Sequence, residues 1–291
     1  MKNTAIRLTL LLLAATLLCS FISCSHQKQK KDESGTVTSG TEWQSGDVTD
    51  SNSTEHSETS DFFQTSDNAS DTDSSWPERA ELTWTADVVK DSYSYDGECL
   101  ILNTINCPLL VGSEDYPVDA INSALRDYCK EYVKITSSDK AVAKDDYSAS
   151  KMDMRDFELH EKSSDFTVYL RGDVISFLFH SYEASGGADS LWLYSALNFD
   201  LTTGEPLTLG EYLEKDEDYA KDYMIAAFTQ IINANPSNFF DDALALLPNE
   251  ISTNHFYLTK DGVTLFLNAY AISPSALGTQ TVVIPYGNLP K

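Results

Sequence analysis

The stretch VISFLFHSYEASGGADSLWLYSALNFDLTTGEPLTL, residues 174–209, decides the fold of this chain. Two of its segments, Val174–Glu183 and Leu191–Asp200, are rich in the aromatic and β-branched residues that are typical of strands. Glycines follow both segments and supply the residues that tight turns favour. Thr208 and Glu211 have the spacing of a capping box, which marks the start of a helix. The stretch therefore predicts two adjacent strands followed by a helix.

The flanking sequence extends this pattern in both directions. Apolar residues that recur every three or four positions predict two principal packing helices, Val118–Val133 and Asp218–Asn235. We also predict a polar loop, a short helix and six further strands: the loop at Thr136–Ser148, the helix at Phe239–Leu247, and the strands at Leu82–Val89, Glu98–Ile105, Phe166–Arg171, Phe256–Thr259, Val263–Ala269 and Thr281–Pro285. Strands in neighbouring hairpins, interrupted by helices, indicate an α+β fold with mostly antiparallel sheets.

The N-terminus is predicted to direct the chain out of the cytoplasm. Lys2 and Arg7 precede an apolar run, Leu8–Leu18, which is too short to span a bilayer core of about 30 Å and is typical of a secretory signal. The run ends in Phe21-Ile22-Ser23-Cys24, which resembles a bacterial lipobox with a small residue before the cysteine. We therefore expect residues 1–23 to be a lipoprotein signal peptide. Lipidation of Cys24 would anchor the chain to the cell membrane on its extracytoplasmic face.

A polar segment separates this signal from the rest of the chain. Residues 25–80 contain 12 Ser and 8 Thr and few apolar residues, so they cannot bury enough surface to offset their chain entropy. We expect residues 24–81 to be a disordered tether that holds the folded part away from the lipid. The remaining sequence, from Leu82 onward, is long enough for one sizeable domain or for two small domains that share a core.

The predicted folded part is strongly acidic. The chain has 45 acidic and 20 basic residues, and 13 of the acidic and 6 of the basic residues lie at or before Glu81. Residues 82–291 therefore carry 32 acidic and 14 basic residues, a net charge of −18. Because no stripe of Lys or Arg is present in the sequence to hold phosphate, nucleic acid is a poor partner. The charge favours a cationic partner, although acidity that only keeps a surface protein soluble is the simpler explanation.

The sequence contains no motif that names a reaction. It has no HExxH helix, no glycine-rich phosphate loop and no GxSxG elbow. Ser185 precedes two glycines, but no histidine can be assigned to it as a general base. His160, His180 and His255 fall within or beside predicted strands, where structural histidines are commoner than metal ligands. We therefore assign no catalytic residue, no metal site and no cofactor.

Beyond Cys24 the chain has three cysteines, Cys99, Cys107 and Cys129. An odd number cannot all pair within one chain, so they do not form a disulfide framework. Two interpretations remain open: a single bridge between Cys99 and Cys107, or free buried thiols that act as small hydrophobic residues.

The C-terminal third resembles a known family of extracellular domains. The segments NFDLTTGEPLTLGEYL, residues 198–213, and HFYLTKDGVTLFLNAYAISPSALGTQTVVIPYGNL, residues 255–289, are similar to the RsiV/PdaC-type domain of unknown function. The preceding part is similar to the smaller domain that accompanies it. The resemblance therefore implies a smaller α+β domain at residues 82–170 and an α+β domain of the RsiV/PdaC type at residues 171–291. The resemblance implies a surface module in cell-wall space, and in RsiV that module binds lysozyme, a basic protein. Asp189 stands where family members often have a histidine.

We place the recognition surface on two turns of the predicted sheet, because loops on a rigid scaffold commonly carry function. The predicted binding residues are Ser185, Gly186, Gly187, Asp189, Tyr270, Pro274 and Gly278. The competing interpretation is that these glycines and Pro274 only shape turns.

The functional hypothesis is a non-enzymatic, lipid-anchored module of the cell envelope. Its partner would be a cationic wall-active protein such as lysozyme, or a cell-wall glycan. An enzyme that acts on peptidoglycan or another polysaccharide, and a structural surface lipoprotein, are the alternatives.

Overall fold

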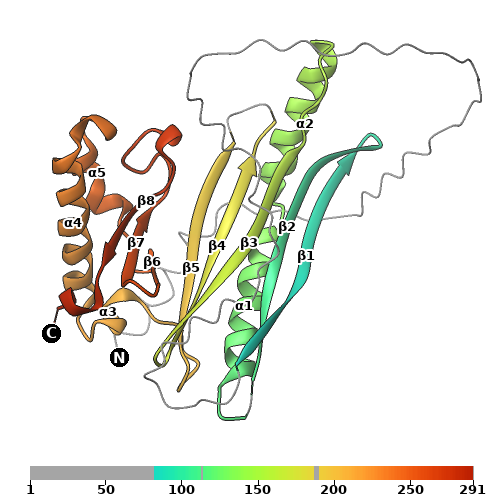
Figure 1. Cartoon of the computed structure of the whole chain (residues 1–291). Helices are drawn as coiled ribbons and strands as arrows, with labels where there is room; N and C mark the ends of the chain where they lie inside the picture. The colour runs from blue at the N-terminus through green and yellow to red at the C-terminus, as the bar shows by residue number, and fades with distance from the viewer. Residues whose placement is uncertain (1–81, 113, 187–189, 291) are drawn as a thin grey trace, which may run out of the picture. The chain divides into compact units, whose positions relative to one another are not determined.

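Five strands form the larger of two sheets (Figure 1). The computed structural model of the chain describes residues 82–112, 114–186 and 190–290. The strands follow chain order across the sheet: β1 (Thr83–Tyr95), β2 (Glu98–Val111), β3 (His160–Arg171), β4 (Val174–Ala184) and β5 (Leu191–Asp200). Neighbouring strands are antiparallel except β2 and β3, which are parallel because two helices connect them.

The first of these helices, α1 (Val118–Val133), covers one face of the large sheet. Ile121, Leu125 and Cys129 recur along its buried side, as the predicted periodicity required. They pack in one core cluster with Phe177 of β4 and Phe199 of β5. Alternate residues of each strand therefore point toward this helix, and the residues between them point to the opposite face.

The second connecting helix, α2 (Ser137–Met152), corrects the predicted polar loop at Thr136–Ser148. Its sequence has few large apolar residues, so no clear helical period of apolar residues marks it. Its buried residues are Ala143, Tyr147 and Ser150. A capping box stabilises its start: the Thr136 hydroxyl accepts from the Asp139 amide, and the Asp139 carboxylate accepts from the Thr136 amide. Packing on the sheet and this cap outweigh the low apolar content of the segment.

Three strands form the second sheet, in the order β6 (Phe256–Leu258), β7 (Val263–Leu267) and β8 (Gln280–Ile284). Three α-helices and three 3₁₀ helices accompany it: α3 (Leu209–Tyr212), α4 (Glu217–Ala234), α5 (Ala243–Glu250), η1 (Pro236–Asn238), η2 (Ser275–Leu277) and η3 (Tyr286–Asn288). Phe228 of α4 and Leu247 of α5 pack against Leu265 of β7 in one core cluster. Every residue of β7 is buried, so this central strand is covered on both faces.

The other face of the small sheet packs on the large sheet. Tyr257 of β6 and Phe266 of β7 share a cluster with Leu178 of β4 and Ala196 of β5. Leu178 alternates with Phe177 along β4, so this contact lies on the face of the large sheet opposite α1.

A buried side-chain network joins the large sheet to the edge of β6. Asn198 of β5 donates from Nδ2 to the carbonyl oxygen of Phe256 (3.0 Å), and its Oδ1 accepts from the Ser176 hydroxyl (2.6 Å). The Ser176 oxygen in turn accepts from the Leu258 amide (3.1 Å). Asn198 and Ser176 are almost fully buried, so they satisfy two backbone groups of β6 that water does not reach.

The predicted α+β class with mostly antiparallel sheets is confirmed. The proposed boundary between residues 170 and 171 falls in the β3–β4 hairpin, and the hydrogen-bonded sheet continues across it. The division into two domains stays a prediction. The signal peptide, Cys24 and the tether of residues 24–81 lie outside the described residues. Among the helices that the structure describes, none is long and apolar enough to cross a membrane.

The cysteine geometry decides between the two interpretations of the thiols. In the structure, none of Cys99, Cys107 and Cys129 forms a disulfide. Cys99 and Cys107 lie eight residues apart on the same strand, β2, which separates them by about 26 Å. That distance is too long for a disulfide. Cys107 instead lies in the core beside α1, where its thiol donates to the Leu125 carbonyl (3.8 Å).

Replacing Asn198 by alanine tests the network between the sheets. Asn198→Ala leaves the buried Phe256 carbonyl without its donor, so we expect the free energy of unfolding to fall by about 1–3 kcal/mol. Urea denaturation followed by circular dichroism measures this change. Asn254→Ala is the control, because Asn254 is exposed and we expect a change within about 0.5 kcal/mol. Equal stabilities of the two variants would contradict the assigned role.

Candidate functional site

The predicted binding residues occupy two loops. Ser185 and Gly186 follow β4, whereas Gly187 and Asp189 lie outside the described residues. Tyr270, Pro274 and Gly278 lie in the loop between β7 and β8, where Pro274 and Gly278 flank the short helix η2. The two predicted turns therefore belong to different sheets.

Asn268 connects the second loop to the large sheet. Its side-chain oxygen accepts from the Tyr194 amide (2.7 Å), and its Nδ2 donates to the Tyr194 carbonyl (2.8 Å). The Thr279 hydroxyl also donates to the Asn268 oxygen (3.3 Å), so both ends of the loop meet at this amide. Tyr194 is the fourth residue of β5, and β5 begins just after the first loop. Both predicted loops thus adjoin the N-terminal half of β5.

Four ring-bearing side chains lie between these loops on the face opposite α1. Tyr182 is paired with Trp192 across β4 and β5, with ring centroids 5.2 Å apart. His180 is paired with Tyr194 in the same way, at 5.0 Å. We call these four residues the aromatic ladder. Its outer rung is accessible, because 51% of Trp192 is exposed.

The inner rung of the ladder is fixed by burial and hydrogen bonding. Burial lowers the pKa of His180 below its usual range. Its Nε2 lies 3.1 Å from the Thr167 hydroxyl, with which it shares a hydrogen bond. The Tyr194 ring also contacts Phe266 of the small sheet edge-on, at 6.1 Å. The inner rung, His180 and Tyr194, is therefore half-buried, whereas Trp192 in the outer rung is exposed.

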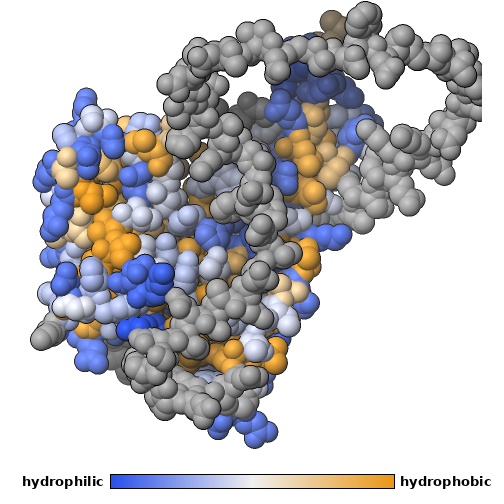
Figure 2. Space-filling view, viewed as in Figure 1, coloured by the Kyte–Doolittle hydropathy of each residue, from blue (hydrophilic) through white to orange (hydrophobic). Residues whose placement is uncertain are grey.

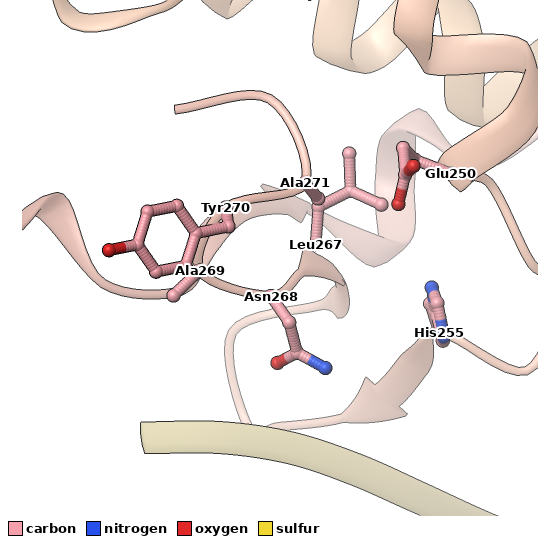
Figure 3. A pocket seen from close by; sticks show the side chains of 7 residues that line it. All are labelled: Glu250, His255, Leu267, Asn268, Ala269, Tyr270 and Ala271. Atoms are coloured by element: carbon pink, nitrogen blue, oxygen red, sulfur yellow. The ribbon is translucent and has the colours of Figure 1, made fainter. Parts of the chain in front are cut away.

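A pocket of about 310 Å³ opens beside the second loop (Figure 3). Its lining consists of the C-terminal residue of α5, the histidine before β6, the last residue of β7 and the start of the following loop: Glu250, His255, Leu267, Asn268, Ala269, Tyr270 and Ala271. This volume lies at the lower end of the range for small-molecule sites. Among the predicted binding residues that the structure describes, Tyr270 lines this pocket.

His255 is held in place by its backbone and its ring, but one of its nitrogens is unpaired. Its carbonyl oxygen accepts from the Phe266 amide (3.0 Å), and its ring lies 5.1 Å from the Phe266 ring. Burial lowers the pKa of His255. Its Nδ1 is buried and has no hydrogen-bond partner in the described part of the chain. An unpaired buried nitrogen costs free energy, but this atom has almost no exposed surface, so a ligand in the pocket does not reach it in this conformation.

Glu250 is the second ionisable group of the pocket. It is the last residue of α5, and the final turn of this helix contains no basic residue. The partial negative charge at a helix C-terminus favours cations by about 0.3–1 kcal/mol and disfavours a carboxylate. Figure 3 shows the Glu250 carboxylate and the His255 ring at the same end of the pocket.

Tyr270 forms the rim of the pocket. Its φ of 67° lies in the left-handed region, which is uncommon for a residue other than glycine. Half of its surface is exposed, and Figure 3 shows its ring directed away from Glu250 and His255. The ring is therefore available on the outer surface, whereas its backbone forms part of the pocket wall.

The first loop lies against a histidine that the sequence did not connect with it. A Cβ atom added to Gly186 would lie 2.6 Å from His160 Nε2 and 3.0 Å from Asp146 Oδ2. His160 Nε2 is 2.9 Å from that carboxylate oxygen, an ion-pair distance, but the nitrogen does not meet the geometry of a hydrogen bond. In the described residues no hydrogen bond joins Ser185 to His160, so the structure supports no nucleophilic role for this serine.

Sequence reasoning missed most of the pocket. It interpreted His255 as an ordinary strand histidine and did not single out Glu250 or Asn268. The available signal was weak: a glutamate at the end of a predicted helical segment, and an asparagine directly after an apolar strand. Within the part of the chain that the structure describes, no group of three His, Cys, Asp or Glu side chains is placed to hold a metal ion.

The C-terminal region matches a described protein family. Residues 211–287 match the model of "Protein of unknown function (DUF3298)", and this range includes all residues that line the pocket. The chain is also 20% identical over 177 residues to the peptidoglycan-N-acetylmuramic acid deacetylase PdaC of Bacillus subtilis (strain 168). That alignment covers 58% of this chain but only 36% of the deacetylase.

Two solved structures are similar to the chain. A DUF3298 family member from Bacteroides fragilis has a TM-score of 0.51 and 22% identity, over 72% of this chain and 92% of the other. A DUF3298 family protein from Pseudomonas aeruginosa PAO1 has a TM-score of 0.45 and 19% identity, over 73% and 93% of the two chains. At this level of identity, the first similarity supports the fold alone.

The contact between Gly186 and His160 predicts a structural role for this glycine. Gly186→Ala adds a Cβ at a φ of +53° and pushes it against His160, so we expect the free energy of unfolding to fall by about 2–4 kcal/mol. Gly97→Ala is the matched control, because Gly97 has a φ of +82° and no atom within 4 Å of an added Cβ. We expect it to cost only about 1 kcal/mol. Urea denaturation compares them, and equal losses would mean that the His160 contact is unimportant.

Proposed function

We propose, on the premise that residues 211–287 are a DUF3298 domain, that this chain is a lipid-anchored, non-enzymatic binding module of the cell envelope. Its proposed partner is a cationic wall-active protein, with lysozyme as the specific candidate. Recognition would use the aromatic ladder and the loop that carries Tyr270. The name of the distantly related deacetylase supports a connection to the cell envelope.

The charge of the folded part is the observation that carries this proposal. Residues 82–291 have a net charge of −18, and opposite charge accelerates the encounter with a basic protein at low ionic strength. The resemblance to RsiV, whose domain binds lysozyme, adds a specific basic protein as the candidate. Acidity alone does not select a partner, so a contact surface is also needed.

The aromatic ladder supplies such a surface. Trp and Tyr are enriched among the residues that contribute most to protein–protein binding, because they bury a large area with little loss of side-chain freedom. Trp192 and Tyr270 are each about half exposed. Trp192 lies two residues before Tyr194, and Tyr270 lies two residues after Asn268, the residue that hydrogen-bonds Tyr194. Figure 2 shows that the visible face of the molecule carries separate hydrophobic patches among polar residues.

A cell-wall glycan is the second candidate ligand. The exposed Trp192 ring offers an apolar face on which a sugar ring can stack, and the neighbouring Tyr182 offers a hydroxyl. Binding of a neutral glycan does not use the net charge of the chain. The salt dependence of the Kd therefore distinguishes a glycan ligand from lysozyme.

Binding to lysozyme should be strong at low salt and weak at high salt. We expect the Kd for the full-length chain to rise about tenfold or more between about 50 and about 300 mM NaCl, because ions screen the attraction between the two charged surfaces. Isothermal titration calorimetry measures the Kd. Lysozyme with acetylated lysines is the control, and it should bind more weakly at low salt. Absence of binding at about 50 mM NaCl would remove lysozyme as the partner.

Truncating the exposed end of the ladder should weaken the complex. We expect Trp192→Ala to raise the Kd for lysozyme about tenfold, as for a central aromatic residue of an interface. Val88→Ala serves as the control, because Val88 is 67% exposed on β1, away from the ladder, and should leave the Kd unchanged. An unchanged Kd for Trp192→Ala would exclude the ladder from the interface.

A further inference from the structure

Two cysteines that lie apart in the sequence meet in the core between β2 and α1. Cys107 of β2 and Cys129 of α1 belong to one cluster of buried residues, and neither exposes more than 1% of its surface. The Cys107 thiol donates to the Leu125 carbonyl (3.8 Å). A helical carbonyl points along the axis toward the amide four residues later, which here belongs to Cys129. The sulfur of Cys107 therefore lies beside Cys129.

The packing of α1 along β2 brings these two positions to the same level (Figure 1). The buried side chain of Asn122 on α1 accepts from the Leu110 amide (2.7 Å) and donates to the Leu110 carbonyl (2.9 Å), which fixes the helix to the strand. From this contact, seven helical residues advance by about 10.5 Å to Cys129. Three strand residues, followed against the chain direction, advance by about 10 Å to Cys107. Because the two distances match, the docked helix keeps the two cysteines together.

The two thiols also influence each other's ionisation. A hydrogen bond from the Cys129 thiol lowers the pKa of Cys107, and the same contact raises the pKa of Cys129. The positive charges of Arg126 and Lys130 also lower the pKa of Cys107, whereas burial opposes them. A lowered pKa increases the share of thiolate, which is the nucleophile in thiol–disulfide exchange. Cys107 is therefore the more reactive thiol of the pair.

The third described cysteine lies too far away to compete. Cys99 precedes Cys107 by eight residues on β2, a separation of about 26 Å. Its thiol donates to the Ile101 carbonyl (3.4 Å). Among the cysteines that the structure describes, Cys107 and Cys129 are thus the pair that the fold brings into contact.

We propose that Cys107 and Cys129 are joined by a disulfide that fastens α1 to β2 when the chain folds in an oxidising environment. The Cys107 thiolate attacks one sulfur of a disulfide oxidant, which forms a mixed disulfide and releases one thiol. The Cys129 thiolate then attacks the Cys107 sulfur and releases the second thiol. The two electrons lost by the cysteines pass to the oxidant, and their two protons end on the released thiols.

Burial determines when this reaction takes place. In the folded chain the surrounding side chains leave an oxidant almost no access to either sulfur, so the exchange precedes the docking of α1 on the sheet. Disulfides form and persist outside the cytoplasm, whereas cytoplasmic thiols stay reduced. The inference therefore rests on the envelope location in the proposed function, but not on the proposed partner.

Refolding in a glutathione redox buffer tests the pair directly. The full-length chain is reduced and unfolded, refolded with oxidised and reduced glutathione, alkylated, digested and analysed by tandem mass spectrometry. We expect a link between Cys107 and Cys129 in most of the soluble chain. Cys99→Ser is the matched control and should leave this link unchanged. Soluble refolded chain without the link, or with Cys107 joined to Cys99, would overturn the proposal.

The bond should also stabilise the folded chain, because a disulfide limits the freedom of the unfolded state. We expect the melting temperature of wild-type chain refolded with glutathione to exceed that of chain refolded in a reductant by about 5 °C or more. Cys107→Ala cannot form the bond and should melt at the same temperature in both buffers. Circular dichroism measures the transitions. Equal melting temperatures of the two wild-type samples would refute the fastening role of the bond.

The disulfide and the proposed function can fail separately. Cells that make the chain are quenched with acid, and the thiols are then alkylated in denaturant. If this traps Cys107 and Cys129 as free thiols, the disulfide is wrong in the envelope, whereas binding to lysozyme still stands on its own measurement. If the link is present and lysozyme does not bind, the disulfide stands and the proposed partner is wrong.

Discussion

Two asparagine side chains hold the sheets together, because each one hydrogen-bonds to the backbone of the edge strand of the other sheet. Asn198 of the large sheet donates to the carbonyl of Phe256 at the edge of β6. Asn268, at the end of β7, pairs with both backbone groups of Tyr194 in β5. A side-chain amide carries a donor and an acceptor, so it can replace one residue of a neighbouring strand. An edge strand buried without such partners would lose stability, and an exposed one would invite pairing with another chain.

This exchange of amides also determines where the candidate site can lie. Because Asn268 is fixed to β5, the loop that follows it is held beside the aromatic ladder of the large sheet. The Asn268 oxygen accepts from both Tyr194 and Thr279, and its Nδ2 donates one of its two hydrogens to Tyr194, so these contacts fix the amide in the pocket wall and leave one N–H. The side chains of this lining that remain for recognition are Glu250 and the exposed ring of Tyr270. Neighbouring residues that line the same pocket thus have different roles: some hold the structure together and others remain available for recognition.

Local patterns predicted most elements of this fold but little of the site. Helix α1 and strand β5 have the predicted bounds, because each buries one regular face and its period is clear. Helix α2 was missed because its buried face contains small and polar residues and its stability depends on a cap and on packing. The contact between Asn268 and Tyr194 joins residues 74 positions apart. No local pattern in the sequence marks such a contact, so the site could be predicted only as two separate loops.

Charge and shape have different parts in the proposed recognition. A net charge of −18 attracts any basic protein over distances comparable to the Debye length, so it raises the rate of encounter without selecting a partner. Selection requires contacts that a wrong partner leaves unmade, since a buried polar group without a partner costs more than a hydrogen bond contributes. A partner that covers the exposed rings of Trp192 and Tyr270 gains from burying them, whereas an equally basic partner that does not fit this surface gains only the screened attraction.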